Sequence, residues 1–230
     1  MSIKKQKRIG GFNHTLYEQA SFPKDQMVKR AEEFYQWIDK RRSIREFSDK
    51  EVPKSVIENI ILAASTAPSG AHKQPWTFCA ISNKELKNSI RIAAEAEEKE
   101  TYEHRMGDRW KNDLAPMAVD MYKPFLEKAP WLIVVCKRAF EFKADGSKHN
   151  NYYVNESVGI ACGMLITAIH NAGLVTLTHT PSPMKFLTKL LNRPENERAF
   201  LLLPVGYPET PTYVPDLKRK SLDLVSEFYE

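Results

Sequence analysis

Apolar residues recur at steps of three and four along several stretches of the chain, the spacing typical of one helix face. Met27, Ala31 and Phe34 follow this spacing, for example. The pattern predicts helices over residues 25–40, from Pro53 to about residue 66, from the capping motif of residues 82–85 to about His104, and over residues 155–171 and 184–191. Gly173 is expected to end the fourth of these helices.

Short apolar runs between the helices predict strands at residues 76–81, 131–136, 174–180 and 200–205. The run 131–136 is apolar at every position, which is typical of a strand buried on both faces. In the run 174–180, Thr176, Thr178 and Thr180 alternate, so we expect them on one face and His179 on the other. The alternation of helices and strands predicts one α/β domain.

Both ends of the chain differ from this middle part. Residues 1–23 are predicted to form a basic N-terminal tail and loop, followed by the domain over 24–222. The stretch over about 95–125 is polar with little apolar pattern and is expected to be a lid. Residues 208–230 carry several prolines and few apolar residues, so we expect this extension to wrap a partner subunit rather than bury itself.

Glycine is scarce, with 9 residues in 230, and none has the spacing of a dinucleotide or P-loop motif. Any phosphate must therefore be bound by side chains or a helix N-terminus. The net charge of +5 includes four basic residues within the first ten, and the remaining residues hold 30 basic against 29 acidic side chains. The alternative of a nucleic-acid-binding module thus depends on a short tail, and we expect no nucleic-acid partner.

Three cysteines, Cys79, Cys136 and Cys162, lie far apart in apolar sequence, which favours reduced thiols in a cytoplasmic protein. The chain has neither a CxxC nor an HExxH motif, so no metal site is expected. The longest nearly apolar run, residues 159–169, is well below the roughly 18 residues of a membrane span, and the N-terminus does not resemble a signal peptide. We expect no membrane association.

Two segments could bind anions. Arg41, Arg42, Ser43 and Arg45 fall within five residues after the first helix, and arginine pairs well with phosphate oxygens. The alternative is a helix C-terminus with cations that suit the helix dipole. Residues 68–72, Pro-Ser-Gly-Ala-His, could present free backbone amides to an oxyanion, although such segments are usually ordinary turns.

Glu98 and Tyr102 are four positions apart and share one helix face, with Lys123 in a later polar segment. An acid, a phenol and an amine that meet could bind the ammonium and carboxylate groups of an amino acid. The alternative is a charged, solvated helix surface. For the alternating threonines, the alternative to a role in a site is that they simply form a solvated face of the sheet.

Several runs together resemble a known family. Residues 41–45, 68–69 with 74–76, and 203–208 are similar to motifs of the nitroreductase-like flavoproteins. Residues 66–72, 105–110, 171–176 and 214–220 resemble, more specifically, the iodotyrosine deiodinases within them. The similarity extends from about residue 40 to residue 222. Two departures are His179, where a hydroxyl residue is usual, and a loop at 182–184 that is one residue shorter.

The resemblance implies a nitroreductase-like α+β fold, with a mainly antiparallel sheet flanked by helices, in a domain-swapped homodimer with FMN at the subunit interface. It assigns cofactor binding to Arg41, Arg42, Ser43, Arg45, Pro68, Ser69, Gly70, Thr178, His179, Thr180 and Arg219. Pro68, Ser69 and Gly70 are expected to come from the partner chain, and the Thr180 hydroxyl to reach flavin N5 as the catalytic group. The substrate is assigned to the Ala71 amide and to Glu98, Tyr102 and Lys123.

The implied activity is FMN-dependent reductive removal of iodide, and also of bromide or chloride, from 3-iodo-L-tyrosine and 3,5-diiodo-L-tyrosine. The product is L-tyrosine, and the electrons pass one at a time from reduced FMN. The implied reductant is NAD(P)H, used directly or through a reductase. The alternative is a general NAD(P)H-dependent nitroreductase or flavin reductase, which needs no groups for an amino acid.

Overall fold

The computed structural model describes residues 5–230, which divide into two compact units, with the boundary between residues 40 and 41. The first unit holds a hairpin of β1 (Gln6–Ile9) and β2 (Phe12–Thr15), and helix α1 (Lys24–Asp39). The helix confirms its prediction within one residue. The tail and loop expected over residues 1–23 contain this hairpin at residues 6–15, and residues 1–4 lie outside the described part. Gly10 and Gly11, with φ of 58° and 87°, form the tight turn of this hairpin.

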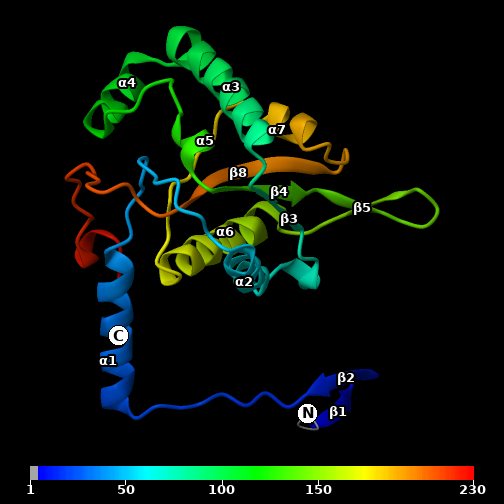
Figure 1. The fold of residues 1–230 in the computed structure, drawn as a ribbon. Coiled ribbons are helices and arrows are strands. Elements are labelled where there is room, and N and C mark those ends of the chain that lie inside the picture. The colour runs from blue at the N-terminus through cyan, green and yellow to red at the C-terminus, as the bar shows by residue number, and fades with distance from the viewer. Residues whose placement is uncertain (1–4) are drawn as a thin grey trace. The chain divides into compact units, whose positions relative to one another are not determined.

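A four-stranded antiparallel sheet is the centre of the second unit (Figure 1). Its order is β3 (Trp76–Ile81), β4 (Trp131–Arg138), β8 (Glu197–Gly206) and β7 (Val175–Thr176). The two central strands are β4 and β8, and residues 132–136 of β4 are completely buried. This confirms the strand predicted to be buried on both faces. The mainly antiparallel sheet with helices on both sides is the expected nitroreductase-like fold.

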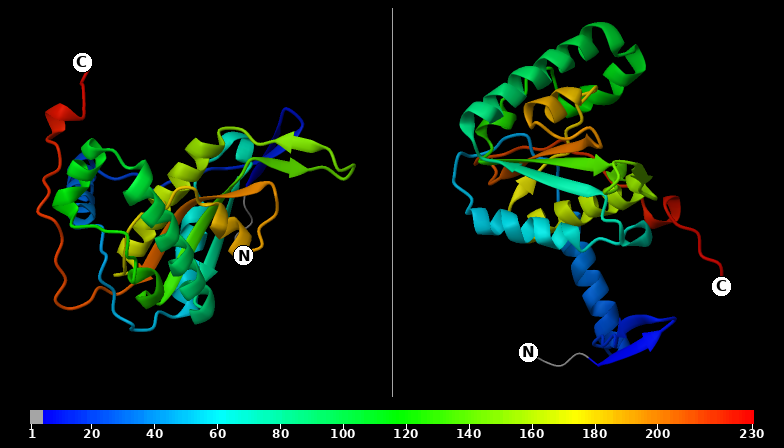
Figure 2. Two further views of the ribbon diagram at one scale, coloured as in Figure 1. Left: turned by 90° about the horizontal axis from the view of Figure 1, so that it is seen from above. Right: turned by 90° about the vertical axis from the view of Figure 1, so that its right-hand side faces the viewer.

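Helices cover the two faces of this sheet in separate layers (Figure 2). On one face, α2 (Lys54–Ser65) and α6 (Val154–Asn171) pack against Ile133 and Val135 of β4. On the other, α3 (Lys84–Glu100), α5 (Phe125–Lys128) and α7 (Lys185–Leu190) pack around Leu132 and Val134. The alternation of side chains along β4 therefore supplies both cores.

Three predicted boundaries need correction. The N-cap of α3 is Asn83 rather than Ser82, because the Asn83 side chain accepts the Leu86 N–H at 2.7 Å. The same helix ends at Glu100 and continues as one π-helical turn through Arg105. The strand expected over 174–180 is regular only at β7, after which the chain pairs again at the single bridge between His179 and Leu202.

The predicted lid region is irregular, with α4 (Asp108–Leu114) followed by a 3₁₀ turn over 115–117. The hairpin of β5 (Phe140–Phe142) and β6 (Lys148–Asn150), which the sequence pattern did not predict, extends away from the sheet in Figure 1. Residues 208–230 contain only a 3₁₀ turn over 222–224 and leave Tyr213, Phe228 and Tyr229 largely exposed. Across residues 5–230, the helices are too short or too polar to cross a bilayer.

Candidate active site

A cavity of about 240 Å³ is lined by the arginine segment and the C-terminal extension. Its walls contain five of the residues that the resemblance assigns to cofactor binding: Arg41, Arg42, Ser43, Arg45 and Arg219. The edge strand positions this segment, because the Ile44 N–H donates to the Thr176 carbonyl at 3.2 Å. We call this space the cationic cavity.

The C-terminal extension closes the cationic cavity through two backbone contacts. The Arg219 guanidinium donates to the Arg41 carbonyl at 3.0 Å, and the Arg42 guanidinium donates to the Pro215 carbonyl. Lys218 also lines the cavity, and sequence reasoning did not single it out, although it lies within the run 214–220 used for the resemblance. Segments that are far apart in sequence therefore meet at one concave, basic surface.

Electrostatics make the cationic cavity a binding site for an anion. Its lining residues in the described part of the chain include five basic side chains and no acid. Burial lowers the pKa of Arg41, and the nearby charges of Arg219 and Arg42 lower it further. An anion placed between these groups relieves that repulsion, and a phosphate offers oxygens in the paired geometry that guanidinium groups prefer. The residues present thus fit the phosphate of FMN.

A larger cavity of about 650 Å³ lies beside the first, and Arg45 lines both. We call it the main cavity. It brings together six further residues predicted from the sequence: Glu98, Tyr102, Lys123, Thr178, His179 and Thr180. The structure also places Trp110, Leu114 and Tyr122 in its wall, which sequence reasoning missed as site residues. The only available signal was that Trp110 lies in the run 105–110, which is similar to the deiodinases.

Glu98, Tyr102 and Lys123 form a compact group in this wall. The Lys123 Nζ lies 3.5 Å from Glu98 Oε2 and 5.7 Å from the centre of the Tyr102 ring. Lys123 is only 6% exposed, and its ammonium also donates to the Asp120 carbonyl. The alternative of a solvated charged helix face is therefore wrong for these three residues, because they meet across two segments instead of pointing into solvent.

Neighbouring groups hold this arrangement in place. The Lys123 N–H donates to Glu95 Oε1 at 2.7 Å, and the Tyr102 hydroxyl donates to the Val119 carbonyl at 3.3 Å. Glu95 is itself paired with Arg91 at 2.9 Å. The segment that carries Lys123 is thus tied to α3, which carries Glu98.

Burial changes the ionisation of the groups in the main cavity. It raises the pKa of Glu98, an effect that the charge of Lys123 opposes, and it raises the pKa of Tyr102. Burial, together with the charges of Lys123 and Arg45, lowers the pKa of His179 to about 3. His179 is therefore neutral at physiological pH.

His179 is fixed from two sides. Its backbone pairs with Leu202 at 2.9 and 3.0 Å, and its ring contacts Phe125 edge to face at 5.8 Å. Nδ1 lies 4.0 Å from Glu98 Oε1, and the buried Nε2 has no hydrogen-bond partner within residues 5–230. Thr178 and Thr180, on either side, are exposed and line the main cavity. Thr176 is buried instead, and its hydroxyl donates to the Pro204 carbonyl at 2.7 Å.

The segment 68–72 lines neither of these two cavities. It forms a 3₁₀ turn over Gly70–His72, in which Ala71 has a left-handed backbone with φ of 48°. The Ser69 hydroxyl accepts the Gln74 N–H at 2.9 Å, whereas residue Ala71 is exposed and its N–H has no acceptor among residues 5–230. A free amide is available here, but not to the cavities of its own chain.

Comparisons with known proteins show which family this chain resembles. Residues 38–207 match the Nitroreductase family. The chain is 57% identical over 213 residues to the iodotyrosine deiodinase of Haliscomenobacter hydrossis, covering 93% of this chain and 96% of that protein. It is 46% identical over 215 residues to iodotyrosine deiodinase 1 of Homo sapiens, covering 92% of this chain and 74% of that protein.

A solved structure is similar as well. The crystal structure of oxidized iodotyrosine deiodinase bound to FMN and 3-iodo-L-tyrosine aligns with a TM-score of 0.74 and 31% identity, over 85% of this chain and 98% of that one. A nitroreductase-like protein from Streptococcus mutans shares the fold with a TM-score of 0.64 and 16% identity.

Proposed function

The chain belongs to the nitroreductase family and, within it, to the iodotyrosine deiodinases, and on this premise we propose that it removes iodide reductively from 3-iodo-L-tyrosine and 3,5-diiodo-L-tyrosine. The observation that carries the proposal is the group of buried Lys123 with partly buried Glu98 and Tyr102, in a cavity that adjoins a basic one. A general nitroreductase has no need of paired charges for an amino acid at this place.

The cofactor of this activity is FMN. The cationic cavity suits its phosphate, and we assign that role to Arg41, Arg42, Ser43, Arg45 and Arg219. When bound and reduced, FMN supplies the two electrons that replace a carbon–halogen bond by a carbon–hydrogen bond, with one proton taken up and one halide released. We propose that the electrons pass one at a time and that bromide and chloride leave by the same route.

The main cavity binds the amino-acid end of the substrate. The substrate ammonium takes the place of Lys123 beside Glu98, and its carboxylate pairs with the freed Lys123 and the Tyr102 hydroxyl. One buried ion pair is thereby exchanged for two, so no charge is left unpaired. A ligand that lacks the ammonium or the carboxylate leaves the charge of Glu98 or Lys123 without its new partner in a site with little water. Glu98 and Lys123 therefore determine the specificity for an amino acid.

The aromatic end of the substrate meets the flavin and the loop 68–72 of a second subunit. A halophenol is more acidic than phenol, and we propose that its oxygen binds as phenolate to the Ala71 N–H of that loop, with Pro68, Ser69 and Gly70 beside the flavin. The free Ala71 N–H supports this role. Closure of the lid over about residues 95–125 removes water from the charged oxygen and strengthens this hydrogen bond.

Thr178, His179 and Thr180 complete the cofactor side of the main cavity. We assign to the Thr180 hydroxyl the hydrogen bond to flavin N5, and its exposure in the cavity wall supports this assignment. Neutral His179 adds no positive charge beside the substrate ammonium.

We further propose that the protein is a cytoplasmic homodimer in which residues 208–230 wrap the partner subunit, with NAD(P)H as the reductant, directly or through a reductase. The exposed aromatic residues of the extension support the dimer, and three free cysteines support the reducing compartment.

Equilibrium binding to the oxidised holoenzyme tests the substrate class. We expect 3-iodo-L-tyrosine to bind far more tightly than 3-iodotyramine, which lacks the carboxylate, or 3-(4-hydroxy-3-iodophenyl)propionate, which lacks the ammonium. Flavin fluorescence reports the binding. Equal affinity for all three ligands contradicts the proposal and favours the general nitroreductase.

A further inference from the structure

The shape of the loop that carries the Ala71 N–H depends on residues outside it. Ala71 and His72 have φ of 48° and 54°, a left-handed conformation that residues with a side chain rarely adopt. Such a conformation persists only where the surrounding structure enforces it. The internal bonds of the loop, which join Gln74 to Ser69 and Lys73 to Gly70, do not attach it to the rest of the fold.

The attachment is at Gly70, against the segment that precedes α6. A Cβ atom added to Gly70 would lie 2.9 Å from Cδ2 of Tyr153, 3.1 Å from the Tyr152 carbonyl oxygen and 3.2 Å from the Tyr152 Cβ. Real Cβ atoms essentially never show the first of these distances, and the other two are tighter than nine in ten real Cβ contacts. Gly70 therefore packs closely against Tyr152 and Tyr153, and a larger residue at this position would have to displace them or the loop.

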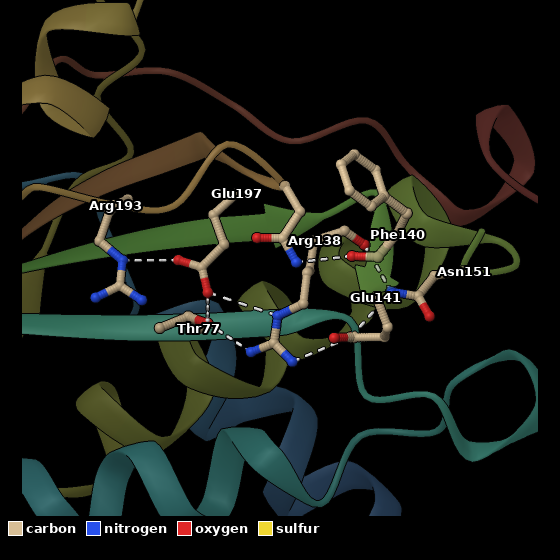
Figure 3. A network of polar contacts seen from close by, with 8 residues as sticks. Thr77, Arg138, Phe140, Glu141, Asn151, Arg193 and Glu197 are labelled. Atoms are coloured by element: carbon tan, nitrogen blue, oxygen red, sulfur yellow. Dashed lines mark hydrogen bonds and ion pairs between the residues drawn. The ribbon is translucent and has the colours of Figure 1, made fainter. Parts of the chain in front are cut away.

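The backbone of the segment that carries the two tyrosines is held on both sides. On one side, Asn151 donates through Nδ2 to the Arg138 carbonyl at 2.9 Å and to Glu141 at 3.3 Å. Figure 3 shows how these contacts join a network with Glu197, which is only 3% exposed and accepts from Thr77 at 2.6 Å.

On the other side, the segment leads directly into α6. Tyr153 is the N-cap, with φ of 47°, and its carbonyl accepts the Ser157 N–H at 2.9 Å. The Ser157 side chain faces the same loop, because its hydroxyl lies 3.4 Å from the Gly70 nitrogen. A continuous set of contacts thus extends from the sheet through the tyrosines to the loop.

We propose that Tyr152 and Tyr153 are positioning residues that hold the loop 68–72 in the conformation in which the Ala71 N–H receives the substrate phenolate. The inference rests on the proposed function, because the phenolate is the ligand of that amide. It adds that the position of the amide is set through the contact at Gly70, by residues that line neither cavity of their own chain.

The test is the ionisation of bound substrate. In the oxidised holoenzyme, where no turnover occurs, the ultraviolet band of the phenolate reports the apparent pKa of the phenol of bound 3-iodo-L-tyrosine. Gly70→Ala should raise this apparent pKa by about one unit or more, which is the loss expected when a hydrogen bond to a charged oxygen is misaligned. Gly163→Ala is the matched control, because its Cβ would meet nothing within 4 Å.

Variants of Tyr153 separate positioning from general damage. Tyr153→Phe keeps the ring atom that touches Gly70 and should behave as the wild type, whereas Tyr153→Ala should raise the apparent pKa. When Gly70→Ala is added to Tyr153→Ala, the further rise in the apparent pKa of the bound phenol should be severalfold smaller than the rise caused by Gly70→Ala alone. The reason is that the ring atom of Tyr153 closest to the added Cβ is then absent. The inference is overturned if the rises in apparent phenol pKa of the two single variants simply add in the double variant. It is also overturned if Gly70→Ala leaves the phenol pKa unchanged.

The outcomes also distinguish the two levels of the proposal. If wild type binds 3-iodo-L-tyrosine as phenolate and the variants bind it identically, the positioning role is wrong and the proposed function stands. If the wild-type holoenzyme does not bind 3-iodo-L-tyrosine, both are wrong.

Discussion

Lys123 and Glu98 lie 3.5 Å apart in the wall of the main cavity, so a zwitterionic substrate has to replace an existing ion pair. Burial raises the pKa of Glu98, and the charge of Lys123 counteracts this. The carboxylate therefore depends on a cation beside it, either Lys123 or the substrate ammonium. At the scale of single residues, this exchange explains why an amino acid rather than a simple phenol suits the site.

Glu98→Gln removes the negative charge but keeps the shape of the side chain. We expect KM for 3-iodo-L-tyrosine to rise about a hundredfold, because a buried charge loses its partner. Reduction of a small nitroaromatic compound by the same variant should be unchanged, since that substrate has no ammonium group. Steady-state kinetics with both substrates provide the measurement.

Glu103→Gln is the control, because Glu103 lies on the neighbouring π turn and is 46% exposed. It should leave both activities at the wild-type level. A Glu98→Gln protein with an unchanged KM for 3-iodo-L-tyrosine contradicts the role of Glu98.

At the scale of elements, periodicity predicted the main helices and strands because their buried faces are regular. The continuous apolar run of residues 131–136 was enough to predict a buried strand. Helix α2 buries Ile57, Ile60 and Ala64, as the spacing of its apolar residues predicts. The hairpin β5–β6 was missed because its strands are three residues each and polar contacts fix it. No local pattern indicates Asn151, whose partners are distant in sequence.

In the candidate site, too, the sequence predicts the features that are local and misses those that depend on tertiary packing. The arginine segment could be recognised locally, since its side chains are adjacent in sequence. The meeting of Glu98 with Lys123 depends on the fold of the segment between them, so spacing alone left it open. The contact of Gly70 with Tyr153 depends on tertiary packing and has no signal in the sequence.

The polar network around Glu197 makes a prediction about stability. Burial alone raises the pKa of this carboxyl group, but hydrogen bonds from Arg193 and Thr77 and the charge of Arg138 outweigh it, so the pKa lies below its usual value. A carboxyl group with a lowered pKa stabilises the fold at neutral pH, and this contribution is lost as the pH falls below about 4.5.

Glu197→Gln should therefore lower the free energy of unfolding at pH 7 by about 2 kcal/mol, because its hydrogen bonds no longer involve a charged acceptor. The difference from wild type should shrink as the pH falls below about 4.5, because the wild-type carboxylate then becomes protonated. Urea unfolding at several pH values provides the measurement. A difference that is independent of pH contradicts this role of the network.

At the scale of the whole molecule, one chain does not complete the proposed site. The free amide of Ala71 lies outside both cavities of its own chain, while α1 buries none of its residues and the C-terminal extension exposes large aromatic side chains. These features support a dimer in which each site takes Glu98 and Lys123, here called the clasp, from one subunit and the loop 68–72 from the other.

Mixed dimers test this division. Glu98→Gln weakens substrate binding by Glu98 and Lys123, and Ala71→Pro removes the N–H of the loop, so each variant alone should show little activity at a low concentration of 3-iodo-L-tyrosine. When the two chains are co-expressed with different tags, the mixed dimer should regain activity at one of its two sites, because that site combines an intact clasp with an intact loop. FMN content confirms that both variants fold. Inactive mixed dimers contradict a loop supplied by the partner subunit.

Anaerobic turnover tests the central claim most directly. The holoenzyme, with its flavin reduced by dithionite, is mixed with 3-iodo-L-tyrosine, and L-tyrosine and iodide are quantified together with reoxidation of the flavin. A two-electron dehalogenation predicts one tyrosine and one iodide for each flavin that is reoxidised. Flavin that stays reduced, with no tyrosine formed, would contradict the assignment of this protein as an iodotyrosine deiodinase.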